Sequence, residues 1–305
     1  MNSSHPTYAG NLQSEGDQTI ATSRTDDGAP APAAEAAARR HIAAVERRAL
    51  GNRGWRGTWM LFRRELARFM KVAGQTIVSP VLTTILWFIV FGYSLGSRLD
   101  EIQGIPYVDF LVPGLIMLNL INNSFLNTGF SLFISKIHGS VVDVLLTPLT
   151  PLQLIIGYTA ASLLRALIIG GLIWLVAGLM GASTLHNPAF TLTFMILTSL
   201  AFALFGLVVS ILAEDFDHIN LFPSFLLMPL TFLGGVFYSL EMLPPPWDSI
   251  SLVNPILYMV NGLRYGMTGV SDVPVGFGLL LVAGSVAVFG ATAAYLLATG
   301  KKLRE

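Results

Sequence analysis

The side chains that most often do chemistry in proteins form no catalytic constellation in this sequence. None of its five histidines belongs to an HExxH zinc pair, and no GxxxxGK(S/T) loop is present to hold a nucleotide phosphate. A GxSxG nucleophile elbow is also missing. The absence of cysteine excludes disulfides, thiolate metal sites and a cysteine nucleophile. We therefore expect a chain that is not an enzyme and that binds no metal and no cofactor of its own.

Three carboxylates stand close together at Glu214, Asp215 and Asp217. Paired carboxylates serve as general acids and bases when their environments push their pKa values apart. These three lie on a short polar link between apolar segments, where solvent stabilises each charge. We interpret them as a charged turn.

A stripe of amide side chains is the first pattern of functional interest. Asn119, Asn123 and Asn127 recur every four residues, a spacing that places them on one face of a helix. Within a membrane such amides either line a route for polar or amphiphilic cargo or join neighbouring helices by hydrogen bonds. The two roles are compatible, and the pattern alone does not choose between them.

Arg165 is the strong charge inside an apolar stretch. Such a group is costly in lipid, so it needs a partner or a function. It could extend to the lipid headgroups, pair with a carboxylate or carbonyl, or contact an anionic cargo. No chain of embedded Asp or Glu accompanies it, which is unfavourable to a proton-coupled carrier.

Composition identifies the class of protein. Of 305 residues, 53% are hydrophobic and only 12% are charged, against roughly 25% charged in average soluble domains. The mean hydropathy is +0.65. So little charge could not cover the surface of a soluble fold, whereas a lipid-facing surface does not need it. The net charge of zero gives no sign of a nucleic-acid partner.

The sequence therefore predicts an all-α polytopic membrane protein. A spanning helix needs about 20 mostly apolar residues, and six segments qualify. They lie at about 76–97, 108–134, 153–180, 190–212, 219–238 and 275–298. Residues 1–54, rich in Ser, Thr, Asp, Gly, Pro and Ala, are expected to form a disordered or partly helical cytoplasmic tail, and 55–305 the transmembrane domain.

The basic residues set the expected orientation. Of 18 Lys and Arg, 11 precede residue 75 and three follow residue 300. By the positive-inside rule both termini lie in the cytoplasm, which requires an even number of spans. The apolar segment Asn254–Val270 is broken by Asn261, Gly262, Arg264 and Gly266. We expect it to turn back on the outer side as a re-entrant helical piece before the last span.

A helix lying along the membrane surface is predicted before the first span. Residues 55–71 read WRGTWMLFRRELARFMK, with an aromatic and aliphatic face and a basic remainder, as in helices of the headgroup layer. The residues concerned are Trp59, Phe62, Arg63, Arg64, Leu66 and Phe69. The alternative is a polar lead-in that carries only topology signals.

Two further segments carry signals. Pro223 and Pro229 interrupt the fifth span, and a broken helix survives in a membrane where its freed backbone faces protein or a water-filled cavity. This span is either a wall of a conduit or a kinked packing helix. The cytoplasmic loop 136–151, KIHGSVVDVLLTPLTP, is too apolar for a free linker. It should bury a short helix in the membrane interface or in a soluble partner.

Together these segments resemble the ABC-2 type transport permease family, the membrane subunits of bacterial ABC exporters. The resemblance runs from about Trp59 to Arg304. It is carried by several blocks in the same order, namely Arg63–Glu65, Arg68–Met70, Val112–Met117, Asp143–Pro148, Asp215–Ile219, Pro229–Leu240, Asn254–Met259 and Arg264–Gly266.

What the resemblance implies is half of a transporter in the bacterial inner membrane. Such permeases pair as homodimers or with a sister permease and use separate ATPase subunits, which carry ATP and Mg²⁺. They export drugs, lipids or glycans. The helix that docks on the ATPase would comprise Val141, Val142, Asp143, Val144, Leu145, Leu146 and Pro148. Residues 59–70 would form the interface helix, and 254–266 part of the outer hairpin.

Two other classes stay open. The asparagine stripe is compatible with an ATP-independent channel or secondary carrier. A membrane enzyme acting on lipids would need a catalytic pair that the sequence does not show.

Overall fold

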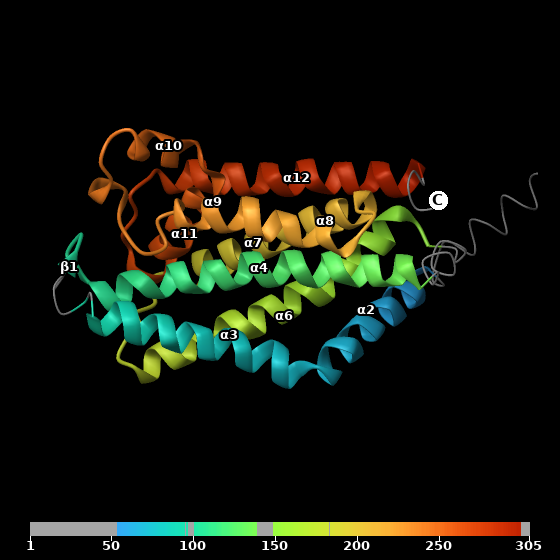
Figure 1. Ribbon diagram of the computed structural model, residues 1–305, viewed down its shortest axis with the longest axis horizontal. Helices are drawn as coiled ribbons and strands as arrows, with labels where there is room; N and C mark the ends of the chain where they lie inside the picture. Colours follow the sequence, from blue (N-terminus) through green and yellow to red (C-terminus); the bar gives the residue numbers. More distant parts are fainter. Residues whose placement is uncertain (1–53, 95, 97–100, 139–148, 183, 300–305) are drawn as a thin grey trace, which may run out of the picture. The chain divides into compact units, whose positions relative to one another are not determined.

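The structure is a computed structural model that describes residues 54–94, 96, 101–138, 149–182 and 184–299. The predicted tail therefore lies outside the described residues, except for Gly54. Long helices run side by side through the described part, as Figure 1 shows. They are α2 (Gly54–Lys71), α3 (Ala73–Trp87), α4 (Tyr107–Ile137), α6 (Pro151–Leu179), α7 (Pro188–Leu212) and α12 (Val275–Thr299).

Five helical stretches of the described residues are long and apolar enough to cross a membrane. They are Ala73–Gly92, Tyr107–Ile137, Pro151–Leu179, Pro188–Leu212 and Val275–Thr299. Each falls within a few residues of a predicted span. The first consists of α3 and a π-helical continuation, η2 (Phe88–Tyr93). The described chain is thus a mostly helical, multi-pass membrane protein.

The segment predicted as the fifth span, 219–238, has a different construction. It is helical from Phe216 to Phe232 through three short pieces, α8 (Phe216–Leu221), η3 (Phe222–Leu227) and α9 (Met228–Phe232). The middle piece is π-helical and begins one residue before Pro223. Proline cannot donate to the regular helical ladder, and π-turns mark such interruptions. Residues 233–238 continue as irregular chain, so the helix is shorter than the predicted span.

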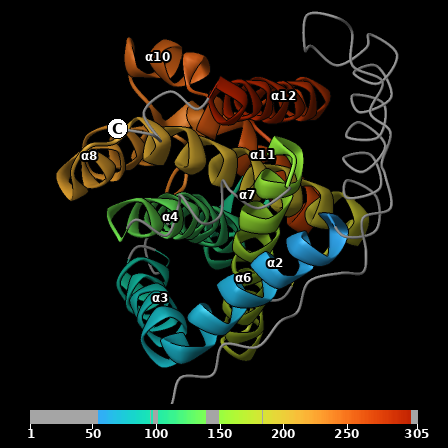
Figure 2. The same cartoon turned by 90° about the vertical axis from the view of Figure 1, so that its right-hand side faces the viewer.

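Helix α4 is the centre of the bundle. It packs against α6, α7 and α11 (Pro255–Thr268), and Figure 2 shows it among these elements. Its long inner face is fully buried, for example at Phe110, Leu115, Leu120 and Phe125. In contrast, α3 and α12 leave most of their apolar side chains partly or fully exposed, as expected of helices that face lipid.

Small residues allow α4 to approach its neighbours closely. A methyl group on Gly206 of α7 would lie against the carbonyl oxygen of Phe125 in α4. At the other end of α4, a methyl group on Gly114 would come 2.5 Å from the carbonyl oxygen of Val236. Backbone contacts of this kind are typical of helix pairs in membranes.

Shorter elements gather at the end of the bundle where α4 begins (Figure 1). Strands β1 (Glu101–Ile102) and β2 (Ile105–Pro106) pair antiparallel, with Glu101 opposite Pro106. Gln103 and Gly104 both have positive φ in the turn, as a two-residue hairpin requires. The 3₁₀ turn η4 (Leu240–Met242) and α10 (Trp247–Val253) lead into α11.

Helices α10 and α11 form the hairpin that stands where the re-entrant piece was predicted. Asn254 joins them, caps α11 through the amide of Ile256, and donates to the carbonyl of Leu230 at 2.5 Å. The far end of α11 returns to the loop before α7, where Asn187 donates to the Gly266 carbonyl. Neither helix is long enough to cross a membrane.

Candidate functional site

The segment predicted to dock on a partner, Val141–Pro148, lies outside the described residues. Its flanks are described. At the end of α4, the ammonium of Lys136 donates to the carbonyls of Ile211 and Ala213 at 3.3 and 3.0 Å. On the other side, Thr150 and Gln153 form a capping box that opens α6. The loop therefore leaves and re-enters the bundle at fixed points.

The predicted interface helix is α2, and its buried face is more polar than the aromatic pattern indicated. The face buried in the bundle comprises Gly54, Thr58, Leu61, Glu65 and Phe69. The predicted apolar face overlaps it only at Phe69. Trp59 is 59% exposed and stacks on Phe62, while Leu66 is partly exposed.

Polar contacts fasten α2 to α4. Glu65 is almost completely buried, accepts a hydrogen bond from Ser131, and pairs with Arg68 at 2.8 Å. Arg64 donates to Ser135 at 3.1 Å, whereas Arg63 points to the exposed side. The sequence pattern places the basic residues of α2 in the headgroup layer and does not predict their contacts with α4. The spacing of Ser131 and Ser135, four residues apart in an apolar helix, was the signal for this contact.

Two members of the asparagine stripe bind Arg165. The guanidinium of Arg165 in α6 donates to the side-chain oxygens of Asn127 at 2.9 Å and Asn123 at 3.2 Å. It also lies 5.3 Å from the ring centre of Phe69. The stripe and the charge, which the sequence predicted separately, form one cluster between α2, α4 and α6. These amides therefore join helices.

The third member of the stripe joins another pair of helices. Asn119 donates to the hydroxyl of Thr84 in α3 at 3.1 Å and to the carbonyl of Leu115. Its neighbour Asn122 donates to the carbonyl of Leu118 at 2.9 Å, within α4. Asn122 is partly exposed and faces a different space from Arg165.

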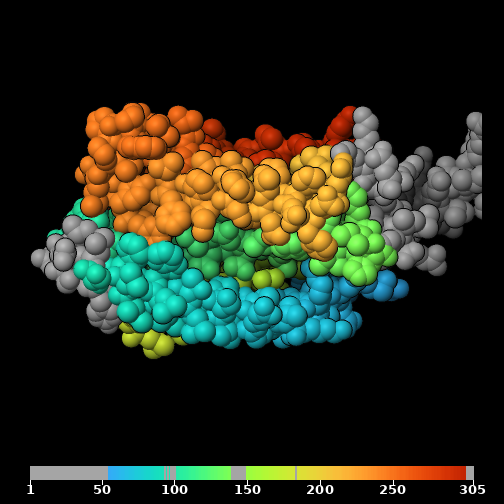
Figure 3. Space-filling view, in the orientation of Figure 1, coloured from blue at the N-terminus to red at the C-terminus, as the bar shows by residue number. Residues whose placement is uncertain are grey.

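That space is a pocket of about 350 Å³ between α3, α4 and the interrupted helix 216–232. Figure 3 shows the hollow as a groove between α3 and this helix, with α4 at its floor. Its lining mixes polar and apolar side chains from Thr83, Trp87, Leu118, Asn122, Pro223, Ser224, Met228, Thr231 and Phe232. Pro223 thus faces this groove. Pro229, which is exposed, does not line it.

A buried arginine lies at the end of the bundle where α4 begins, and the sequence did not predict it as a site. Arg264 in α11 is completely buried and donates to the carbonyl of Gly235 at 2.6 Å. It also contacts Asn261 and Asp272, and its guanidinium lies 3.6 Å from the ring centre of Phe110. Burial lowers the pKa of Arg264, and the neighbouring carboxylate of Asp272 partly offsets this effect, so that the pKa is about 10. The guanidinium therefore stays charged at neutral pH.

The same cluster ties the loops of this end together. Gln103 of the β-turn donates to Asp272 at 2.6 Å and to Ser239 at 3.2 Å, and Ser239 donates to Asp272. The signal in the sequence was a charged residue inside an apolar segment, which usually has a buried partner. The sequence pattern at Asn261 and Arg264 predicts only a break in a span.

No group of three or more potential metal ligands occurs among the residues that the structure describes. The carboxylates Glu214 and Asp215 occupy the exposed link between α7 and α8, and Asp217 is exposed in the first turn of α8.

Comparison with known proteins agrees with this arrangement. Residues 56–268 match the family model described as ABC-2 type transporter. The inner membrane transport permease YadH of Escherichia coli K12 is 40% identical over 230 residues, which cover 75% of this chain and 90% of YadH. Nodulation protein J of Rhizobium leguminosarum bv. viciae is 25% identical over 236 residues, covering 76% and 90%. The matched region includes every cluster described above except Asp272.

Proposed function

Since the chain belongs to the ABC-2 type transporter family, we propose that it is the permease subunit of an ATP-binding cassette exporter. In this proposal a separate subunit binds ATP and Mg²⁺, and this chain supplies the path for an amphiphilic, lipid-like, drug or glycan substrate. The sequence contains no phosphate-binding loop of its own. The observation that carries the proposal is the family match together with the groove beside the interrupted helix.

The groove has the chemistry that such a path requires. Asn122, Ser224 and Thr83 place polar groups beside Trp87 and Phe232, so that both parts of an amphiphilic molecule find a suitable surface. The π-helical turn at Pro223 adds an irregular backbone at this depth, which a membrane tolerates where it lines a cavity. In contrast, Asn123 and Asn127 are already bonded to Arg165 and serve packing.

A second protomer would close this groove. Polar side chains that open toward lipid are unfavourable, and exposed apolar side chains adjoin the lining residues in the sequence. Phe225 is 77% exposed, and Met228, Leu82 and Leu86 are more than half exposed. We propose that a second copy, or a sister permease, packs against this face and so completes the path.

The ATPase would act through residues 141–148 at the end of α4. Lys136 joins this end to the end of α7, and Glu65 and Arg64 join it to α2. Movement of the docked segment would therefore be transmitted to α2 and α7. The proposed location is the bacterial inner membrane, with both termini in the cytoplasm. In this topology residues 216–232 make a sixth crossing, and the α10–α11 hairpin re-enters the membrane from the outer side.

Affinity purification tests the partner. The tagged chain is purified with the ATPase encoded beside it, and Leu145→Asp is compared with Leu252→Asp, which adds the same charge on exposed α10. We expect Leu145→Asp to reduce the recovered ATPase at least tenfold and Leu252→Asp to leave it unchanged. Equal recovery with all three chains would overturn the docking role of this segment.

Transport in liposomes separates the proposal from an ATP-independent channel or carrier. The probes are a fluorescent short-chain phospholipid and a lipophilic cationic dye, with the chain alone or with the ATPase. ATP-dependent movement only in the presence of both subunits is expected, and Ser224→Trp, which fills the groove, should abolish it. Movement driven by an ion gradient with the chain alone would establish the alternative.

A further inference from the structure

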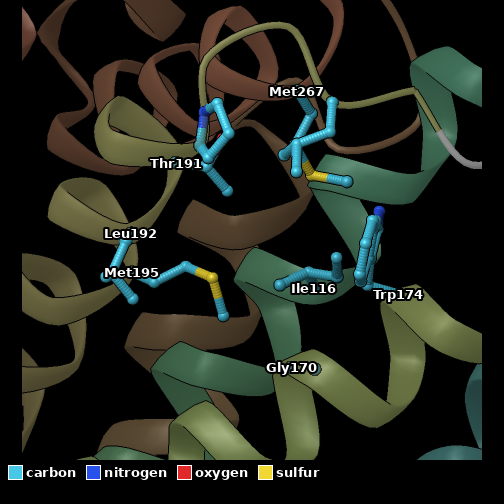
Figure 4. Close-up of a pocket in the computed structure, with 10 residues that line it drawn as sticks. Ile116, Gly170, Trp174, Thr191, Leu192, Met195 and Met267 are labelled. Atoms are coloured by element: carbon cyan, nitrogen blue, oxygen red, sulfur yellow. The ribbon is translucent and has the colours of Figure 1, made fainter.

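A second pocket lies on a different face of the bundle, between α4, α6, α7 and α11. It has a volume of about 280 Å³, and Figure 4 shows the side chains that surround it. In this view Ile116 and Gly170 lie below the pocket, Met267 and Thr191 lie above it, and Leu192 and Met195 face Trp174 across it. It shares no residue with the groove beside Pro223.

The lining is almost entirely apolar. Its one hydroxyl, that of Thr191, already donates to the carbonyl of Asn187 at 3.0 Å. Water needs two or more polar partners to occupy a cavity, and an apolar cavity of about 150 Å³ stays dry and accepts a molecule such as benzene. A pocket of about 280 Å³ with this lining therefore suits a hydrocarbon group larger than benzene.

The pocket opens toward the surroundings of the spanning helices. Leu192 of α7 is 50% exposed and Trp174 of α6 is 37% exposed, and Gly171 between them is also exposed. These positions lie within the last three turns of α6 and the first two turns of α7. At that depth a membrane presents the upper part of its acyl chains. The medium itself thus supplies a hydrocarbon occupant.

Charge around the mouth indicates the headgroup. Asp109 precedes Ile116 by two helical turns on the same face of α4, or about 10 Å of rise, and Thr184 beside Leu185 hydrogen-bonds to its carboxylate. The Oδ1 atom of Asp109 is buried and has no hydrogen-bond partner, while the side chain as a whole is partly exposed. Exposed His186 follows Leu185 at the same edge of the pocket, whereas Arg264, in the described part of this end, is completely buried.

We propose that this pocket binds one acyl chain of a phospholipid whose headgroup carries an ammonium, with that ammonium near Asp109. The acyl chain enters between α6 and α7 and contacts Met195 and Met267. An ammonium headgroup can pair with the carboxylate of Asp109, whereas an anionic headgroup gains no such pair. The site does not depend on the ATPase or on transport, because its lining and its charge belong to this chain alone.

Photolabelling tests the site. The purified full chain is reconstituted in nanodiscs with phosphatidylethanolamine that carries a diazirine on one acyl chain, and labelled peptides are identified by mass spectrometry. We expect labels on the peptides containing Met195 and Met267. Gly171→Leu should reduce them at least fivefold, because a side chain at Gly171 meets no atom within 4 Å and enters the free space.

Gly284→Leu is the matched control, since Gly284 on α12 is also exposed and equally unobstructed. It should leave the labelling unchanged. Equal labelling of wild type and Gly171→Leu would overturn the proposal. Labelling lost in Gly171→Leu together with crosslinks between two copies through Leu192→Cys would overturn it too, because the face would then be a protein interface.

The headgroup is tested by competition. Unlabelled phosphatidylethanolamine should displace the probe several-fold better than phosphatidylglycerol of the same chains. Asp109→Asn should bring the two lipids to within about twofold without removing the label from Met195. Equal competition by both lipids against wild type would overturn the role of the ammonium, and the melting temperatures of all variants in detergent report whether each is folded.

Discussion

In the described part of the chain, Arg165 and Arg264 lie inside the helix bundle, and their partners differ in charge. Arg264 faces a carboxylate, that of Asp272, as well as a carbonyl. Arg165 is held by the neutral amides of Asn123 and Asn127, and its Nε has no partner. Removing a partner from a buried charge costs more than removing the charge together with its need for partners. The two sites therefore respond differently to substitution.

At Arg165 the amides should matter more than the charge. We expect Asn127→Leu to lower the free energy of unfolding by about 2 kcal/mol, because a partly buried guanidinium loses an acceptor. Arg165→Met should cost less, and Arg165→Met with Asn127→Leu should cost about the same as Arg165→Met alone. Unfolding in detergent micelles, followed by circular dichroism, measures all three. If Arg165→Met proved the most costly, the guanidinium would contribute more than these two bonds.

At Arg264 the charge itself should be required. Arg264→Met leaves the carbonyl of Gly235 and the carboxylate of Asp272 without their buried donor. Breaking a buried pair in this way costs about 3–5 kcal/mol, so we expect a large fall in melting temperature in detergent. Arg63→Met, on the exposed side of α2, is the control and should change the melting temperature very little. A small effect of Arg264→Met would mean that the outer loops hold together without this cluster.

At the scale of helices, the close approach of α4 and α7 makes a further prediction. Gly206→Ala places a methyl group against the carbonyl of Phe125, where backbone rather than a flexible side chain must move. We expect a loss of about 1–3 kcal/mol, as for other overpacked positions. Gly284→Ala, where a methyl group meets nothing within 4 Å, should be neutral. Equal stability of the two variants in the same micelles would show that the helices separate at little cost.

The helices themselves were largely predictable from the sequence, because long apolar runs have one stable form in lipid. Five predicted spans coincide with helices to within a few residues. The segment 219–238 differs because Pro223 and Gly234–Gly235 replace regular helix by a π-turn and a loop. Prolines indicate that a helix is interrupted, but the packing of the surrounding helices and loops determines the residue at which it ends.

Contacts between helices were less predictable than the helices. The spacing of Asn123 and Asn127 identified a polar face, yet it could not show that Arg165 lies opposite. Likewise, the hydrogen bond from Gln103 to Asp272 joins positions 169 residues apart, and no local pattern records such a pair. The candidate groove is similar, since its walls come from three separate segments.

For the whole molecule, the direction in which the bundle crosses the membrane is open to a direct experiment, because the chain contains no cysteine. Single cysteines can therefore be introduced without a background signal. Glu101→Cys, at an exposed position of strand β1, and Asp217→Cys, in the exposed first turn of α8, lie at opposite ends of the bundle. Their reactivity with a maleimide that cannot cross the membrane reports which end faces outward.

The proposed orientation predicts opposite behaviour at these two positions. In intact spheroplasts, Glu101→Cys should be labelled within minutes, whereas Asp217→Cys should react only after the membrane is permeabilised. The physical reason is the basic charge, 11 of the 18 Lys and Arg before residue 75, which keeps that end in the cytoplasm. The cysteine-free parent is the control for background. Labelling of Asp217→Cys from outside would reverse the orientation and move the docking segment away from any cytoplasmic ATPase.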